Sequence, residues 1–232
     1  MKKLTLGVAA LMTLAAACTS KQNAGSQAEA QADSTIRINC MICVTPDVRD
    51  SVVLLSKELV EASQQDEGMI EYDLLESATD ESSLMIYETW QGQDQLDKHS
   101  ASEHFTRIVP ELQRLASTMD VQVLKAGQKA DVLAALRLNC PMKVAAENRD
   151  AVIALGKELV AGSQQDEGNI SYDLFLSTTD STRMLIFETW ADQPSLDKHS
   201  AAEHFTRIVP QLKEKSEMGV VTFEMAAPGT AE

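Results

Sequence analysis

The sequence predicts an α+β protein made of two ferredoxin-like β-α-β-β-α-β repeats whose sheets pack together as an intramolecular pseudo-dimer. Three observations predict this fold: an internal duplication, strand and helix periods that recur in both copies, and one apolar sheet face per copy that needs a partner. Aligning Ile36–Pro110 with Leu136–Pro210 at a constant offset of 100 gives 44 identities in 75 positions. The duplicated unit is about 90 residues long, whereas a solenoid needs shorter units and at least three of them.

The first half of each repeat predicts a strand, a helix and a hairpin. Apolar residues alternate along residues 36–43, which is typical of a strand. Helical spacing of apolar residues predicts a helix over 50–63, and Gly68 supplies the glycine that commonly follows a helix. Two further strands, 70–76 and 84–90, are expected to form a hairpin.

The second half of each repeat predicts two helices. Residues 93–99 form the first, which is short. Ser100 and Glu103 have the Ser-x-x-Glu spacing of a capping box, so we expect a second helix to begin near Ala101, and the second copy repeats the signal. Pro110 removes a backbone donor and is expected to kink or interrupt this helix.

The last strand of the first repeat is predicted over 121–124, which completes the sheet. Two helices cover one face of such a sheet, and the other face must be buried. The second copy is the obvious partner, so the two sheets should pack face to face about an approximate two-fold axis. We expect the domains to cover 36–126 and 135–226, with a short connector at 127–134 and a tail at 227–232.

The N-terminus predicts an export signal and a tether. Two lysines and a short apolar run make 1–17 a signal peptide, too short to span a membrane. It resembles a bacterial lipoprotein signal, in which Cys18 becomes the lipidated first residue, although Ala15 replaces the usual leucine. Ordinary cleavage after Ala17, giving a secreted protein, is the alternative. Residues 18–35 read as a flexible tether, and the protein is expected to be extracytoplasmic, on the periplasmic or cell-surface side of a membrane.

Composition limits the partners. The formal net charge of −15 argues against nucleic acid and against docking on an anionic membrane through a basic patch. Membrane contact is therefore expected only through the lipid anchor, and the internal pseudo-dimer favours a monomeric chain. The sequence contains no phosphate-binding glycine loop, no flavin or nicotinamide fingerprint and no metal-ligand cluster, so we expect neither a cofactor nor a metal.

Three motifs carry a family resemblance: Asp66-Glu67-Gly68-x-x-x-Tyr72, then Glu88-x-Trp90, then Leu96-x-x-His99-x-x-Ser102-x-His104-Phe105. Each copy resembles the antibiotic biosynthesis monooxygenase domain of the dimeric α/β-barrel superfamily, although Ala202 replaces the serine in the second copy. The resemblance implies cofactor-independent oxygenases of quinols and polycyclic phenols, haem-degrading enzymes, or an isomerase of a phosphorylated sugar. An extracytoplasmic location disfavours the last of these.

The preferred hypothesis is a monooxygenase that oxidises a small aromatic substrate, such as a quinol, with O₂. A haem-binding or haem-degrading protein is the first alternative, and a non-enzymatic ligand-binding lipoprotein is the second. The candidate catalytic residues are His99, His199, Glu88 and Glu188. The candidate substrate-binding residues are Asn39, Asn139, Trp90, Trp190, Tyr72, Tyr172, Arg107 and Arg207.

Each of these candidates has a structural alternative. His99 titrates near neutral pH and could act as a general base, or it could cap the short helix or pack beneath Trp90. Glu88 shares a strand face with apolar residues, so it could orient His99 or pair with a cation at the sheet edge. Trp90 could form a pocket wall or belong to the core. Asn39 should face the barrel interior, where its amide could bind a substrate oxygen.

Two further patterns predict no metal site and no local disulfide. His104 would lie about 140° around a continuous helix from His99, so a structural role beside Phe105 is expected. Cys40 and Cys43 would lie about 10 Å apart on opposite strand faces, too far for a disulfide. A Cys40–Cys140 bridge stays open as an alternative.

Overall fold

The computed structural model describes residues 35–125, 128 and 133–226. The first repeat consists of β1 (Ile36–Cys43), α2 (Pro46–Ser63), β2 (Met69–Ser77), β3 (Ser83–Trp90), α3 (Gln93–Ser100), α4 (Glu103–Leu115) and β4 (Thr118–Lys125). The second consists of β5 (Leu133–Val144), the 3₁₀ turn η1 (Ala146–Asn148), α5 (Arg149–Ser163), β6 (Asn169–Ser177), β7 (Arg183–Trp190), α6 (Gln193–Ser200), α7 (Glu203–Lys215), β8 (Ser216–Met218) and β9 (Val221–Ala226). The predicted order of elements is confirmed in both copies.

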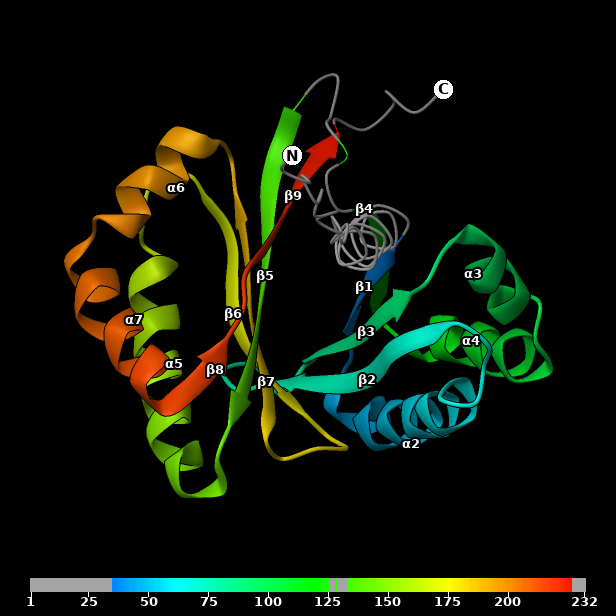
Figure 1. Cartoon of the computed structure of the whole chain (residues 1–232). Helices are drawn as coiled ribbons and strands as arrows, with labels where there is room; N and C mark the ends of the chain where they lie inside the picture. Colours follow the sequence, from blue (N-terminus) through cyan, green and yellow to red (C-terminus); the bar gives the residue numbers. More distant parts are fainter. Residues whose placement is uncertain (1–34, 126–127, 129–132, 227–232) are drawn as a thin grey trace, which may run out of the picture.

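The strands of both repeats join in one antiparallel sheet, in the order β4-β1-β3-β2-β6-β7-β5-β8, with β9 also beside β5. Figure 1 shows the helices of the two repeats on opposite outer sides, with the strands between them. The edges β2 and β6 pair over three residues, Leu75–Ser77 against Phe175–Ser177. This edge pairing was not predicted, because it is made by backbone hydrogen bonds and so produces no side-chain pattern in the sequence.

The inner sheet faces meet as predicted. Their shared apolar cluster consists of Leu75, Met85, Tyr87, Phe175, Leu185 and Phe187, with Met41 packed against it. Reciprocal hydrogen bonds mark the pseudo-two-fold axis: Thr79 donates to Asp173 and Thr179 donates to Asp73, each over 2.7 Å. Each repeat therefore buries its open sheet face against its twin.

The start of α4 corrects the predicted capping box. Ser102, and not Ser100, caps this helix, and its Oγ accepts from the backbone N–H of Phe105 over 3.3 Å. Ser100 lies in the last turn of α3, where its hydroxyl donates to the carbonyl of Leu96. The short helix continues one residue further than expected, which moves the cap by two residues.

Pro110 was predicted to kink or interrupt α4, and it does not interrupt the helix. The helix continues through Pro110 to Leu115. A proline inside a helix removes one backbone hydrogen bond, but Ile108, Val109 and Leu112 are buried on both sides of it and hold the helix on the sheet.

The expected signal peptide, Cys18, the tether up to residue 34 and the tail lie outside the described residues, as does most of the connector. Strand β5 begins at Leu133, so the last two connector positions are strand. No helix in the described ranges is long and apolar enough to cross a membrane.

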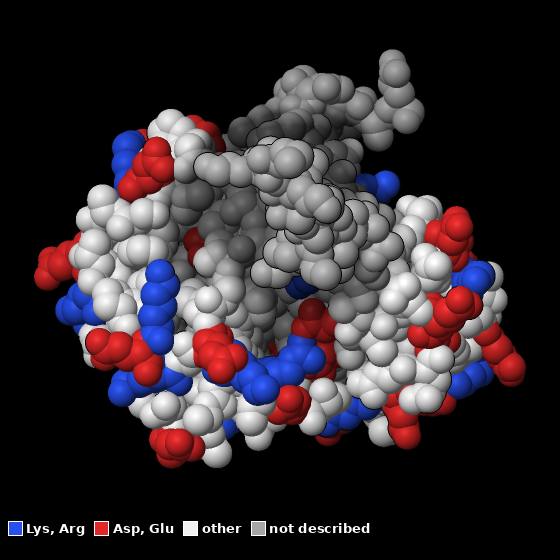
Figure 2. Space-filling model, viewed as in Figure 1, with Lys and Arg blue, Asp and Glu red and all other residues white. Residues whose placement is uncertain are grey.

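Cys40, Cys43 and Cys140 are free thiols, so Cys40 and Cys140 are not bridged. Figure 2 shows acidic and basic side chains intermixed over one face.

Candidate functional site

A cavity of about 310 Å³ lies in the first repeat, between the sheet and helices α2, α3 and α4. Most of its lining is apolar. The polar lining side chains are Tyr72, Glu88, Gln93, Asp97, Ser100 and Gln113. Val121 and Val123, on β4, line it while about half exposed, so they mark its opening to solvent. A largely apolar cavity with a few converging polar groups is the usual form of a small-molecule site.

Glu88 is the central charged group of this cavity. Its side chain is almost fully buried, and the indole N–H of Trp90 donates to Oε2 over 2.8 Å. Burial raises the pKa of Glu88 to about 7, although hydrogen bonds from Trp90 and Tyr72 partly oppose the shift. Burial also raises the pKa of Tyr72 well above its usual value, so that this phenol stays a donor. Glu88 can therefore exchange a proton near neutral pH.

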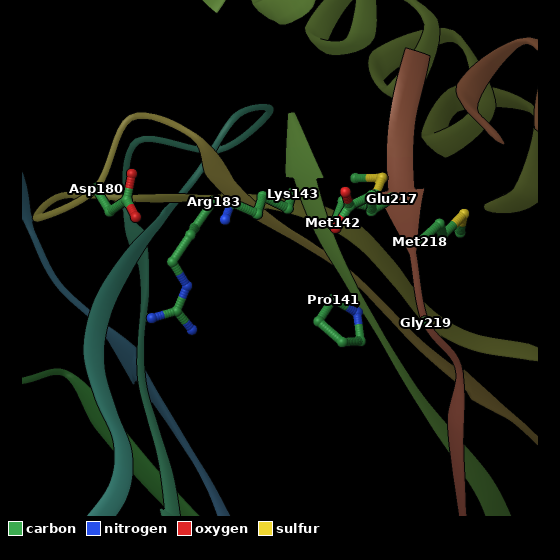
Figure 3. A pocket seen from close by; sticks show the side chains of 8 residues that line it. All are labelled: Pro141, Met142, Lys143, Asp180, Arg183, Glu217, Met218 and Gly219. Carbon is green, nitrogen blue, oxygen red and sulfur yellow. The ribbon is translucent and has the colours of Figure 1, made fainter. Parts of the chain in front are cut away.

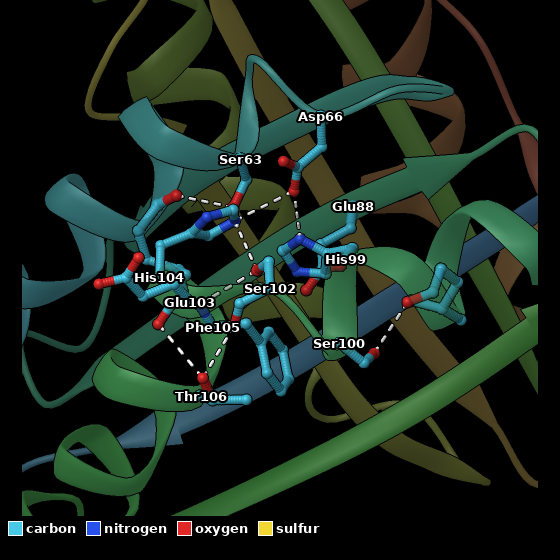
Figure 4. A network of polar contacts seen from close by, with 12 residues as sticks. Ser63, Asp66, Glu88, His99, Ser100, Ser102, Glu103, His104, Phe105 and Thr106 are labelled. Carbon is cyan, nitrogen blue, oxygen red and sulfur yellow. Dashed lines mark hydrogen bonds and ion pairs between the residues drawn. The ribbon is translucent and has the colours of Figure 1, made fainter.

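His99 lies behind this carboxyl and does not line the cavity. Its Nδ1 is 2.7 Å from Oδ2 of Asp66, and its ring packs on Trp90 with 4.5 Å between ring centroids. Its Nε2 is buried and has no hydrogen-bond partner among the described residues. Burial lowers the pKa of His99, and the hydrogen bond with Asp66 opposes this. The imidazole therefore favours the neutral form and supports Trp90 from behind. Figure 4 shows His99 between Asp66 and Glu88.

His104 joins the same network. Its Nε2 lies 3.0 Å from Oδ2 of Asp66 and 3.0 Å from the hydroxyl of Ser102 (Figure 4). The estimate of 140° assumed one continuous helix, but α3 ends at Ser100 and α4 begins at Glu103. The turn between the helices brings both imidazoles onto one carboxylate.

Asp66, His99 and His104 have donor atoms that all lie within 4.8 Å of one another. Two imidazoles and a carboxylate can hold a divalent transition metal. The prediction that the two histidines do not share a metal-binding face is therefore wrong, because the turn between α3 and α4 brings both onto Asp66.

Several predicted residues lie away from the cavity. Asn39 and Asn139 do face the interior between the sheets, where Nδ2 of Asn139 donates to Oδ1 of Asn39 over 3.0 Å. They contact each other across the two repeats and sit on the opposite sheet face from Glu88. Trp90 is fully buried beneath Glu88 and forms no wall of the cavity.

Arg107 does not line the cavity of the first repeat, and neither arginine lines a described pocket. They lie on the outer side of α4 and α7, where each forms a 2.7 Å ion pair with an exposed glutamate, Glu58 or Glu158. Their predicted contact with a substrate does not fit this position. Helical periodicity alone did not separate the outward face from the inward one.

The sequence predicted no role for Asp66, Gln93 or Asp97. Asp66 precedes Gly68, whose φ of +78° suits glycine and where an added Cβ would lie 2.2 Å from the side chain of Gln95. On α3, Gln93 donates to Asp97 over 2.8 Å, and both line the cavity. Their i, i+4 spacing was the available signal.

The second repeat keeps this framework. Trp190 donates to Glu188 over 2.8 Å, and His199 lies 2.7 Å from Asp166. Burial raises the pKa of Glu188, and the thiol of Cys140 donates to its Oε1 over 3.5 Å.

A second hollow, of about 460 Å³, lies where β5 meets β8. Figure 3 shows Asp180 and Arg183 on one side of it, and Pro141 with Glu217 and Met218 on the other. Its charges are of both signs, and it contains no pair of groups arranged for acid–base chemistry.

The chain is similar to several known proteins. The model of the antibiotic biosynthesis monooxygenase family matches residues 35–111 and 125–211. The presumptive monooxygenase YcnE of Bacillus subtilis is 31% identical over 77 residues, which cover 33% of this chain and 81% of YcnE. An uncharacterized protein of Synechocystis is 29% identical over 100 residues, covering 42% and 67% of the two chains. A solved structure of a conserved protein from Bacteroides thetaiotaomicron is 36% identical and covers 40% of this chain and all of the other, with a TM-score of 0.40.

Proposed function

Because the chain belongs to the antibiotic biosynthesis monooxygenase family, we propose that it oxidises a small phenol or quinol with O₂ and no cofactor, in the cavity of the first repeat. The observation that carries the proposal is Glu88. It is a buried carboxyl that lines an apolar cavity and has a pKa raised to about 7.

The first step is proton transfer from the substrate hydroxyl to the carboxylate of Glu88. A phenol such as the tyrosine side chain has a pKa near 10, so a carboxyl that titrates at about 7 is a better acceptor than one at its ordinary value. Trp90 and Tyr72 hold the carboxyl in place through the hydrogen bonds that they donate. The proton acceptor is therefore matched to neutral pH.

The second step is oxidation of the phenolate by O₂. One electron passes from the phenolate to O₂, and the substrate radical and superoxide combine at a ring carbon. The resulting peroxide takes the proton back from Glu88, which gives a hydroperoxide and restores the carboxylate. For a phenol with a hydrogen at that carbon, one oxygen atom enters the ring and the other leaves as water, so that phenol and O₂ give quinone and water. The apolar cavity contributes by holding the reactants together and excluding bulk water.

His99 acts in this scheme as a positioning residue. It packs on Trp90 and is held by Asp66, so it keeps the indole N–H aimed at Glu88. Because its ring is buried and does not line the cavity, His99 is not placed to bind the iron of a haem there. A His99→Gln variant should lower the rate while the pH midpoint stays near 7. A midpoint that disappears with His99 would make the histidine the base.

The proposal is tested by oxygen uptake. The purified metal-free protein is supplied with a panel of quinols and phenols under ¹⁸O₂, and the products are analysed by mass spectrometry. Uptake with one ¹⁸O in the product, lost in Glu88→Gln, is the expected result. Uptake that needs added flavin or metal, or that survives Glu88→Gln in full, would overturn it.

We also propose that the chain works outside the cytoplasm as a lipid-anchored monomer. The signal-like residues 1–17 and Cys18 support this, and the pairing of the two repeats within one chain removes the need for a second copy. Palmitate labelling in a bacterial host should be lost in Cys18→Ala. A labelled Cys18→Ala chain, or a dimer by light scattering, would contradict the proposal.

A further inference from the structure

Two grooves flank the short ladder between β2 and β6, and the pseudo-two-fold axis relates them. The ladder joins only three residue pairs, so the first half of each strand diverges from the other repeat. The groove beside Glu71 and Arg183 has a volume of about 20 Å³. The corresponding groove beside Ser171 and Ser83 has a volume of about 410 Å³. One groove is filled and its twin is open.

The difference comes from two substitutions between the repeats. In the filled groove, Glu71 forms ion pairs with Arg183 and with Arg37, the latter at 3.8 Å. In the open groove, Ser171 stands at the position of Glu71 and Ser83 at that of Arg183. A carboxylate and a guanidinium are thus both missing from the open groove.

Arg137, the counterpart of Arg37, keeps its guanidinium without a carboxylate. It is 4% exposed, and its Nη1, like that of Arg37, has no hydrogen-bond partner in the described part of the chain; unlike Arg37, it also has no ion pair there. Its Nε donates to the hydroxyl of Thr189 over 2.7 Å. Burial lowers the pKa of Arg137, and Asp120 opposes this electrostatically but forms no ion pair with it. A buried arginine without a counter-ion is costly for a folded protein.

Arg137 does not line the open groove itself but packs directly behind a side chain that does. The residue belongs to β5, and its Cζ lies 3.8 Å from the ring centroid of Phe187 on the neighbouring strand β7. Phe187 lines the groove. Ser171, on the next strand β6, also lines it, and its hydroxyl donates to the same Thr189 oxygen that Arg137 contacts. The guanidinium thus reaches from β5 across the neighbouring strand β7, next to residues that line the groove.

We propose that this groove binds a small organic carboxylate, whose carboxylate group pairs with Arg137 in the place that Glu71 fills in the other repeat. Arginine suits this role because its planar fork matches a carboxylate. The apolar body of the ligand packs against Met41, Phe175 and Phe187. Asp173 is the acidic side chain of the lining, and Thr79 and the backbone N–H of Leu174 donate to its Oδ1. The site lies between the repeats, separate from the Glu88 cavity.

Calorimetric titration of the full chain with benzoate and hexanoate tests this, with benzyl alcohol and hexanol as neutral analogues. We expect at least one carboxylate to bind with one site per chain and at least tenfold more tightly than its neutral analogue. Arg137→Gln should weaken that binding at least tenfold. Carboxylates that bind no better than the alcohols would overturn the proposal.

Ser171→Glu is the matched variant, because it supplies an internal carboxylate at the position of Glu71. It should abolish carboxylate binding and raise the melting temperature without removing Arg137, which covers the case in which Arg137→Gln does not fold. The reciprocal double variant Glu71→Ser, Arg183→Ser should open the filled groove and raise the stoichiometry from one site to two. Unchanged binding in Ser171→Glu would contradict the assignment to Arg137.

Discussion

The two repeats have the same framework and different linings. Asp66, His99 and Trp90 have counterparts in Asp166, His199 and Trp190 with hydrogen-bond lengths that agree within 0.1 Å. Around the carboxyls the copies differ: the thiol of Cys140 donates to Glu188, and Lys213 replaces Gln113. Both repeats thus keep the Asp, His and Trp side chains that position the glutamate, whereas the other side chains around that glutamate differ.

The outer strands differ as well. Strand β4 pairs with β1 without a break, whereas the second repeat divides the same strand into β8 and β9 opposite Pro141. Proline has no N–H to donate to a ladder, so this edge is interrupted beside the second repeat's site. Equivalent sequence motifs therefore do not make equivalent sites, and the first repeat is the better candidate for the proposed catalysis.

The largest expected effect separates the two carboxyls. Glu88→Gln should reduce kcat/KM for the best quinol about 100-fold or more, because it removes the proton acceptor. The matched Glu188→Gln should change it less than about threefold if the first repeat carries the proposed reaction. Initial rates in an oxygen electrode measure both. Equal losses in the two variants would make the repeats equivalent and break the comparison.

The next effect is on stability as a function of pH. The folded pKa of Glu88, about 7, lies above its ordinary value of 4.5, so its contribution to stability is fully present below pH 4.5 and is lost as the pH rises through 7. Glu88→Gln should therefore raise the free energy of unfolding by about 3 kcal/mol at pH 8 and change it little at pH 4. Urea unfolding at the two pH values checks this. A constant difference would show that the carboxyl is not buried as described.

Removing the aspartate that holds the buried histidine should lower the free energy of unfolding equally in both repeats. Asp66→Ala and Asp166→Ala each leave a buried imidazole Nδ1 without its partner, which should cost about 2 kcal/mol. Chemical denaturation of each variant measures the loss. A loss in one repeat alone would show that the shared framework is not equally important.

The smallest effect concerns the helix caps. Ser102→Ala should destabilise the protein by about 1 kcal/mol, because the N-cap of α4 loses its side-chain acceptor. The reverse change, Ala202→Ser, should stabilise it by a similar or smaller amount, because α7 has no side-chain cap. Opposite shifts in melting temperature are expected, and shifts of the same sign would contradict the assigned caps.

Local patterns predicted the fold well and the site only in part. The strand period correctly placed Glu88 and Trp90 on one face and Asn39 on the other. It could not show that Asp66 contacts both His99 and His104, because three separate elements meet there.

The direction in which a charged helix residue points was equally hidden. Arg107 and Gln113 both belong to α4, yet only Gln113 lines the cavity. Periodicity identifies the apolar stripe of a helix but leaves the polar positions at its borders undecided. The raised pKa of Glu88 also required the three-dimensional burial of the strand, which no single stretch of sequence contains.

The central claim is that Glu88 accepts the substrate proton, and the pH dependence of kcat/KM tests it most directly. In a Glu188→Gln background, where only the first repeat keeps its carboxyl, kcat/KM should rise about tenfold per pH unit below pH 7 and level off above it. A kcat/KM that stays constant between about pH 5.5 and 8.5 would contradict the claim. A midpoint that stays the same after Glu88→Gln would contradict it as well.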